Sequence, residues 1–388
     1  MRLLITATLD FEQFTEDRDQ PPYAILSHTW DPDEVSFAGH VGRQDLSKAG
    51  HAKINGSCKI AASEGFKYIW IDTCCIDKSS SAELSKVINS MFRWYRGAAI
   101  CYAYLSDVHV LEDPEEGGMP SFSASRWFTR GWTLHELLAP TELVFLTSDW
   151  AEIGTKGTLS AVVSGITHMD DEVLTTGNWD DFSAAQKMSW AAGRQTTRVE
   201  DEAYCLMGLF DVNMPLLYGE GNKAFLRLQM EILRVSEDQS IFAWTPAKRR
   251  RTGDSSRVLM AGSPRDFQQT SRISRLRMLT KNSSYESTFE IVSHRVKMSQ
   301  PATEEVHALE LKKLSTIPET HHICAVKSAR NINSLIYKAD RKSQQKIAWE
   351  WYYFRPAATI VPLRCLVGGR KVTILLFNPS DSGDITGP

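Results

Sequence analysis

The sequence lacks several features that would assign it directly to a class of protein. Its seven cysteines are odd in number, and none has the paired Cys-x-x-Cys spacing of a zinc site or a disulfide framework. No stretch reaches the roughly 18 apolar residues that span a membrane. The opening residues contain too few apolar side chains for a secretory signal. We therefore expect a soluble, cytoplasmic protein in a reducing compartment, without a membrane span.

The sequence also lacks a dominant charge of one sign. It has 44 Lys and Arg against 47 Asp and Glu, which leaves a formal net charge of -3. Such a chain has no general attraction to nucleic acid or to an anionic bilayer, so we expect no nucleic-acid partner. The exception is the basic run Lys248–Arg251. It is either a solvated linker, the interpretation we prefer, or a nuclear localisation signal.

The length and patterning of the chain predict several domains. With 388 residues, 42% of them hydrophobic, the chain is globular and too long for one ordinary core. Residues 1–160 alternate strand and helix patterns, 161–245 read as a helical module packed on them, and 246–257 form the basic linker. Residues 258–388 carry short alternating runs that predict a β-rich C-terminal domain.

The first domain is predicted to be an α/β domain with a doubly wound parallel sheet. A helix over residues 59–66 separates the first two of four compact apolar runs. A second helix begins at Ser80, which forms a capping box with Glu83, and its apolar face extends from Leu84 to Tyr95. Strands that alternate with helices in this way are typical of a sheet covered on both faces. The predicted strands are Tyr23–Trp30, Tyr68–Asp72, Ala98–Leu105 and Leu143–Leu146.

Polar clusters follow these strands, where α/β proteins bind ligands. Residues 27–30, 72–75 and 112–136 are therefore expected to meet at one edge of the sheet. The leading candidate is Glu136, which lies on a short helix whose leucines face a core. Aromatic side chains and an arginine near a partly desolvated carboxylate suit a ligand pocket and shift its pKa. The nearby candidates are Trp127, Arg130, Trp132 and His135. The plainer interpretation is an amphipathic helix with a surface Glu.

Other chemistries have weaker support in the sequence. Cys74 and Cys75 are either a nucleophile pair or buried packing, and the second interpretation is the more common one for vicinal cysteines. His28 and His135 offer a dyad or a metal site with Cys74 or Asp72, but no metal-ligand spacing supports it, so no metal is expected. Asp72 and Asp77 are as well suited to capping the Ser80 helix or holding the loop as they are to binding a ligand. The Gly219–Lys223 stretch lacks the phosphate-loop spacing and is read as a helix start.

Four blocks of the sequence, in order, resemble the HET (heterokaryon incompatibility) domain of filamentous fungi. They are Tyr23–Trp30, Tyr68–Lys78, Glu83–Tyr95 and Arg130–Pro140. The resemblance covers about residues 23–154, and Met188–Gly208 resembles the segment that commonly follows in these proteins. It implies a role in fungal innate immunity, namely self/non-self recognition and programmed cell death after unlike hyphae fuse.

HET domains are in turn similar to Toll/interleukin-1 receptor (TIR) domains, which have a flavodoxin-like sheet. The stretch Trp132–Leu137 resembles their Trp-Cys-x-x-Glu-Leu helix, with Thr133 in place of the cysteine. The resemblance implies that Glu136 supports hydrolysis of NAD, a substrate here and not a cofactor. By the same analogy, the substrate-binding residues are Ser27, His28, Trp30, Asp72, Trp127, Arg130 and Trp132, with a Trp ring stacking on the ligand and Arg130 holding a phosphate.

The alternative to an enzyme is a death-inducing interaction module without chemistry. In that hypothesis the loop Thr73–Ser81 forms a homotypic interface, as such loops do in TIR assembly. Both hypotheses imply a homotypic oligomer. The sequence shows no attached nucleotide-binding or repeat module, so the trigger is expected in the helical or β-rich part, or in a separate partner protein.

Overall fold

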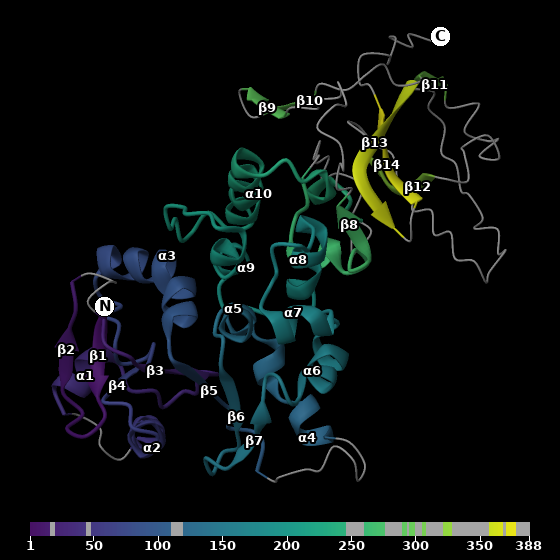
Figure 1. Ribbon diagram of the computed structural model, residues 1–388. Coiled ribbons are helices and arrows are strands. Elements are labelled where there is room, and N and C mark those ends of the chain that lie inside the picture. The colour runs from purple at the N-terminus through teal and green to yellow at the C-terminus, as the bar shows by residue number, and fades with distance from the viewer. Residues whose placement is uncertain are drawn as a thin grey trace. The chain divides into compact units, whose positions relative to one another are not determined.

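The computed structural model describes residues 1–15, 20–43, 48–109, 119–245 and 260–275, together with six strands between residues 289 and 377 (Figure 1). Contacts within the chain divide it into two compact units. The first comprises Met1–Trp179 and Arg194–Ala224, and the second comprises Asp180–Gly193 and Phe225–Pro388. The chain therefore passes between the units after Trp179, after Gly193 and again after Ala224.

The first unit contains a seven-stranded sheet in the order β2-β1-β4-β3-β5-β6-β7. Strands β4, β3, β5 and β6 run parallel to one another, whereas β1, β2 and β7 pair antiparallel at the edges. The α/β class is thus confirmed, and the sheet is mixed where a parallel one was predicted. The strands are β1 Arg2–Ile5, β2 Phe11–Gln13, β3 Ala24–His28, β4 Tyr68–Trp70, β5 Ile100–Tyr104, β6 Leu143–Leu146 and β7 Glu152–Thr155.

The two long helices of this unit lie on opposite faces of the sheet, α2 (Ala49–Ser63) on one and α3 (Ser81–Gly97) on the other (Figure 1). Every residue of β3 and β4 is buried between them, which explains their continuous apolar runs. Helix α2 begins ten residues before the predicted start. Its buried side includes His51, Lys53 and Ser57, so the apolar pattern there is interrupted.

Helix α3 begins as predicted, since the side chain of Ser80 accepts a hydrogen bond from the backbone nitrogen of Glu83 at 3.2 Å. The carboxylate of Glu83 accepts instead from Arg2 of β1 at 2.8 Å and from the backbone nitrogen of Asp77 at 2.9 Å. The capping acid therefore also ties the helix to an edge strand. Val87, Ile88, Met91 and Tyr95 are buried along the expected face.

The element predicted over residues 127–138 is divided into a 3₁₀ turn, η2 (Arg126–Thr129), and a helix, α5 (Thr133–Leu138). All six residues of α5 are buried, so it lies deeper in the first unit than an amphipathic surface helix would. The unit is completed by α1 Phe37–Val41, α4 Pro120–Ser123, α6 Ser160–Thr167, α7 Asp171–Thr176, α9 Asp201–Tyr204 and η3 Met207–Phe210.

The second unit contains helices in both of its chain segments, and its strands follow later in the second segment. Helix α8 (Ala184–Ala191) has a full capping box of Ser183 and Gln186. Helix α10 (Lys223–Val235) begins at the last two residues of the first unit. The turns η4 Gln239–Phe242 and η5 Pro264–Phe267 follow.

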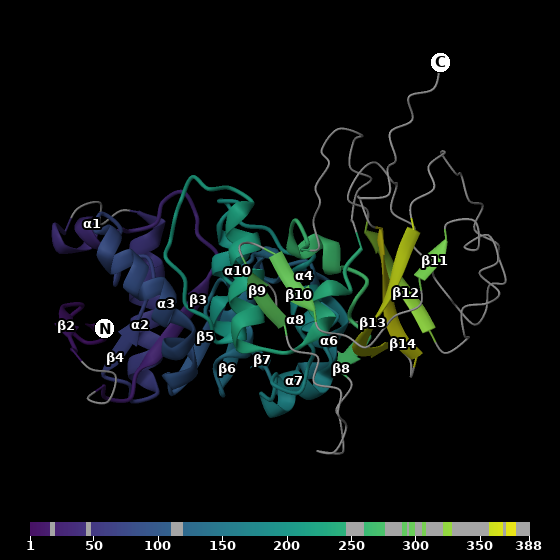
Figure 2. The ribbon, with the colours of Figure 1, turned by 90° about the horizontal axis from the view of Figure 1, so that it is seen from above.

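The strands of the second unit form two sheets. β9 (Phe289–Val292) and β10 (Arg295–Met298) pair with each other. A five-stranded sheet joins β8 Ile273–Arg275, β11 Glu305–His307, β12 His321–Lys327, β13 Ala357–Val367 and β14 Arg370–Phe377. Figure 2 shows β13 and β14 side by side in it. The predicted linker 246–257, with its basic run, lies outside the described residues. Of the helices described, none is long and apolar enough to cross a bilayer.

Candidate functional site

The order of the parallel strands determines where a ligand site is expected. β4, the next strand in the chain, lies on one side of β3, and β5 lies on the other side of β3. In open α/β sheets, ligands bind beyond the carboxyl ends of the strands where the order reverses in this way. A ligand site is therefore expected among the residues that follow β3, β4 and β5. Of the predicted 112–136 segment, residues 112–118 lie outside the described residues.

Glu136 lies at this part of the sheet, on α5, and only 5% of it is exposed. Its carboxylate accepts a hydrogen bond from the hydroxyl of Ser27, on β3, at 2.5 Å. The same hydroxyl accepts from the indole nitrogen of Trp127, on η2, at 2.8 Å. Three residues named from the sequence, on three separate elements, thus form one buried chain of hydrogen bonds.

Burial raises the pKa of Glu136 to about 8, and the negative charge of Asp72 acts in the same direction. Hydrogen bonds from Ser27 and Tyr95 and the positive charge of Arg194 oppose this rise. At pH 7 most of the Glu136 carboxyl is therefore protonated. A carboxyl with a pKa near neutrality is able to exchange a proton or to gain a charge when a cationic ligand arrives.

Trp127 is completely buried. Its ring packs edge-to-face with Phe128 and Phe145, with centroids 5.2 and 5.7 Å apart. In this conformation its indole nitrogen orients Ser27, and its ring lies within an aromatic core.

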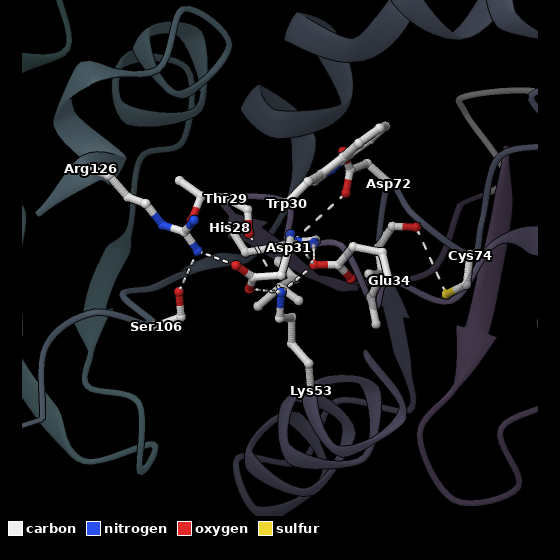
Figure 3. Close-up of polar contacts among 12 residues, drawn as sticks. His28, Thr29, Trp30, Asp31, Glu34, Lys53, Asp72, Cys74, Ser106 and Arg126 are labelled. Carbon is white, nitrogen blue, oxygen red and sulfur yellow. Dashed lines mark hydrogen bonds and ion pairs between the residues drawn. The ribbon is translucent and has the colours of Figure 1, made fainter. Parts of the chain in front are cut away.

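Trp30 has the opposite environment, because 47% of it is exposed. Its indole nitrogen donates to Asp72 at 2.8 Å, and the ammonium group of Lys78 lies 3.4 Å from its ring centroid. These contacts hold an exposed ring at the carboxyl end of the sheet (Figure 3). Of the three candidate tryptophans, Trp30 is the one best placed to offer a ring face to a ligand.

His28 is the residue after Ser27, and its side chain is fully buried. Its ring nitrogens lie 3.6 Å from Glu34 and 3.8 Å from Asp72, too far for hydrogen bonds. Both nitrogens and one carboxylate oxygen of Asp72 therefore lack a hydrogen-bond partner. Within the described ranges no group of three His, Cys, Asp or Glu side chains is arranged to hold a metal ion.

An ionic network surrounds His28 that the sequence did not reveal (Figure 3). Lys53 pairs with Asp31 at 3.2 Å and also with Glu34, and Arg126 pairs with Asp31. Burial alone would raise the pKa of Glu34, but His28 and Lys53 outweigh it and lower that pKa to about 2. Asp31 and Glu34 follow Trp30 closely in the sequence, and this proximity was the signal that could have indicated them. No sequence pattern indicated Lys53, because it lies in the part of α2 that was not predicted.

Arg130 and Trp132 contact a different part of the unit. The guanidinium of Arg130 donates to the hydroxyl of Thr197 at 3.3 Å, and the ring of Trp132 packs edge-on against His135. Burial lowers the pKa of His135 to about 3, so its imidazole is neutral. The described contacts of Arg130 and Trp132 lead toward residues 195–205, away from Ser27 and Asp72.

The remaining candidates have structural roles in this conformation. Cys74 and Cys75 are buried, and a hydrogen bond from Cys75 together with burial raises the pKa of Cys74 well above its usual value, so it is a protonated thiol. Asp77 accepts from the backbone and hydroxyl of Ser79 and so holds the loop. The backbone nitrogens of Gly219 and Gly221 donate to a carboxylate within the chain, that of Glu200.

This fold and site define an α/β domain with a polar cluster beyond the carboxyl ends of its central parallel strands. Residues 23–117 match the family model "Heterokaryon incompatibility protein (HET)". The match confirms the resemblance to the HET domain for this part of the chain, which holds three of the four sequence blocks. Residues 223–316 match a second family model, described as a domain of unknown function, DUF8212.

A curated relative is the vegetative incompatibility protein HET-E-1 of Podospora anserina. It is 48% identical over 219 residues, which are 55% of this chain and 16% of that protein. The chain thus spans about a sixth of the length of this relative. No solved structure matches the chain.

Proposed function

We propose that this chain acts in heterokaryon (vegetative) incompatibility, as a cytoplasmic protein whose activation after fusion of unlike hyphae leads to programmed cell death. The match to the HET family and the 48% identity to a vegetative incompatibility protein support this role. Because the relative is much longer, its other activities and partners are not carried over.

We further propose that the HET domain hydrolyses NAD to nicotinamide and ADP-ribose, in the manner of a TIR domain. The observation that carries this proposal is the buried Glu136 carboxyl, hydrogen-bonded to Ser27 beyond the strand at which the sheet order reverses. The strand order β4-β3-β5-β6 is the order 2-1-3-4 along the parallel strands, which is that of flavodoxin-like sheets.

In the proposed reaction the bond between the ribose C1′ and the nicotinamide nitrogen breaks, and its electron pair neutralises the pyridinium ring. Water then adds to C1′ and loses a proton. The ionised Glu136 stabilises the positive charge that develops on the ribose. Trp30 offers a ring face to the cationic ring, and His28 and Asp72 offer polar groups to the ribose. Because Glu136 is covered in this conformation, turnover requires a rearrangement at this edge, which we assign to assembly.

The alternative is a non-enzymatic, death-inducing scaffold that assembles through the loop Thr73–Ser81. A buried, protonated carboxyl also serves as a purely structural hydrogen-bond partner. Residues 73–76 of this loop are buried, whereas Lys78, Ser79 and Ser81 are exposed. A scaffold would therefore tolerate loss of Glu136 and respond to substitutions at these three positions.

The deciding experiment follows free nicotinamide after NAD is added to the purified chain, both dilute and forcibly clustered. Glu136→Gln is compared with Glu142→Gln, which changes an exposed acid shortly after the same helix. Release by the wild type and by Glu142→Gln, but not by Glu136→Gln, supports the enzyme. Absence of release from clustered, folded wild type rejects hydrolysis and leaves the scaffold.

A further inference from the structure

Residues 194–197, which we call the return segment, begin where the chain re-enters the first unit. The segment lies against the residues just before α5. The backbone nitrogen of Gln195 donates to the carbonyl of Thr129 at 2.7 Å, and the nitrogen of Gly131 donates to the carbonyl of Gln195 at 2.8 Å. A short parallel bridge between Arg130 and Gln195 results. The return segment thus fixes the backbone that leads into the helix of Glu136.

Arg194 opens the return segment and is 6% exposed. One guanidinium nitrogen donates to the carbonyl of Arg130 and to the hydroxyl of Thr133, both at 2.9 Å. Thr133 is the first residue of α5, and its hydroxyl lies 2.5 Å from the carbonyl of Trp127. Arg194 therefore holds together the end of η2 and the start of α5.

These contacts continue to the candidate catalytic carboxyl. Trp127, held through its carbonyl by Thr133, donates through its indole to Ser27, which donates to Glu136. A contiguous path of hydrogen bonds and short covalent steps thus leads from Arg194 to Glu136. A change at the guanidinium should therefore alter the orientation of the Ser27 hydroxyl that donates to Glu136.

Arg194 also acts on Glu136 through its charge. A buried guanidinium is unfavourable unless an opposite charge lies nearby. Its burial lowers the pKa of Arg194 to about 10, and the negative charge of ionised Glu136 opposes that change. Around Glu136, Asp72 after β4 raises the pKa of the carboxyl, and Tyr95 of α3 and Ser27 of β3 lower it by hydrogen bonds. Cys101 of β5 also faces it. Among these described groups Arg194 supplies the positive charge.

We propose that Arg194 is a positioning residue for Glu136, which sets the start of α5 and supplies the positive charge against which the carboxyl ionises. Its consequence for turnover rests on the proposed function. Its effect on the hydrogen bonds and ionisation of Glu136 does not.

The first test reads the network without activity. The full chain is labelled with ¹⁵N at its 11 tryptophans, and the indole signal of Trp127 is assigned from its loss in Trp127→Phe. Because Trp127 and Glu136 share Ser27, this signal should titrate with pH and lose its titration in Glu136→Gln. In Arg194→Met the midpoint should rise by about one pH unit or more. Arg194→Lys should restore part of the shift. An unchanged midpoint in folded Arg194→Met overturns the proposal.

The second test measures nicotinamide release by the same variants. Arg194→Met should lower kcat at pH 7 more than it changes KM, and raising the pH should recover part of the loss. Arg194→Lys should fall between Arg194→Met and the wild type. If the wild type releases no nicotinamide, the proposed function fails, whereas the indole titration still decides the role of Arg194.

A second variant covers the case in which Arg194→Met does not fold. A Cβ at Gly131 would lie 2.4 Å from the Cγ2 of Thr196, and a β-branched side chain cannot easily move away. Gly131→Ala should therefore displace the return segment and shift the Trp127 signal. Gly193→Ala is the matched control, since nothing lies within 4 Å of its added Cβ. Equal spectra for these two variants would overturn the proposal.

Discussion

Two adjacent residues of β3 lead to polar clusters of opposite character. Successive side chains of a strand point to opposite faces of the sheet. Ser27 joins a buried, uncharged chain of hydrogen bonds with Trp127 and Glu136. His28 instead faces an ionic network that includes Glu34 and Lys53.

The comparison shows how one strand holds two carboxyl groups in opposite protonation states. Burial raises the pKa of Glu136 to about 8. The neighbouring His28 and Lys53 lower that of Glu34 to about 2. At pH 7 the first acid is mainly neutral and the second is charged. Asp72 belongs to both clusters, since it lies 3.8 Å from His28 and its charge raises the pKa of Glu136.

The largest expected effect concerns the uncharged cluster. Glu136→Gln keeps the size of the side chain and a hydrogen-bond acceptor for Ser27 but removes the charge on which the proposed reaction depends. Nicotinamide release should fall by about 100-fold or more, the scale of losing one key electrostatic contact. Circular dichroism checks that the fold is kept. Full activity of the folded variant would show that the two clusters do not differ in catalytic role.

The next largest effect concerns the ionic network. Lys53→Met removes a buried cation and leaves Glu34 and Asp31 with less compensation. The free energy of unfolding should fall by about 2 kcal/mol at pH 7, below the full cost of a broken buried pair because Glu34 is partly exposed. Urea unfolding measures it.

The sign of the pH dependence sharpens this second prediction. The pKa of Glu34 is lower in the fold than in the unfolded chain, so its stabilisation is present above about pH 4.5 and is lost as the pH falls toward about 2. The difference between Lys53→Met and the wild type should therefore shrink as the pH is lowered through this window. A constant difference would argue that Lys53 acts by packing alone.

The opposite pH dependence is expected for Glu136. Its pKa is higher in the fold, at about 8, than in the unfolded chain, so the stability linked to it is complete below about pH 4.5 and is lost as the pH rises through 8. Glu136→Gln should gain stability relative to the wild type by a few kcal/mol between pH 5 and about 9. Thermal unfolding of the wild type and of Glu136→Gln, measured at pH 5 and at about pH 9, checks this prediction. Equal pH profiles would place the carboxyl in solvent.

The smallest effect on stability is expected at the exposed edge of the site. Trp30→Ala removes a side chain that is 47% exposed, so the free energy of unfolding should change by less than about 1 kcal/mol. If its ring stacks on NAD, KM should rise several-fold while kcat changes less. The KM of Trp30→Phe, which keeps a ring, should fall between those of the wild type and Trp30→Ala. An unchanged KM would remove Trp30 from the binding site.

The sequence was sufficient for the central part of the fold. Strands β3 to β6 and helix α3 carry long apolar runs or a clear periodic face, and these patterns predicted them. The edge strands β1, β2 and β7 are three or four residues long, and their pairing depends on distant parts of the chain. The start of α2 was missed because its buried side carries charged and polar residues.

For the candidate site, the sequence identified the residues but not how deeply their side chains are buried. The motif around Glu136 and the strand of Ser27 suggested both residues. Their direct hydrogen bond, the complete burial of Trp127 and the raised pKa depend on packing from three elements, which spacing does not encode. Arg194 was missed because the polar stretch around it has no periodic pattern that would place it beside α5.

The three passages of the chain between the units have a consequence for dissecting the protein. Helix α8 belongs to the second unit, where the hydroxyl of Thr270 donates to the carbonyl of Ala185 at 2.7 Å and Ser183 donates to the carbonyl of Ile273. The residues that support α8 therefore come from far downstream, and Arg194 follows shortly after it. Truncation beyond Trp244 would leave α8 without these partners while its end remains tied to the return segment. A truncation there would therefore also disturb residues that precede the cut, and a loss of activity would not by itself assign a role to the removed part.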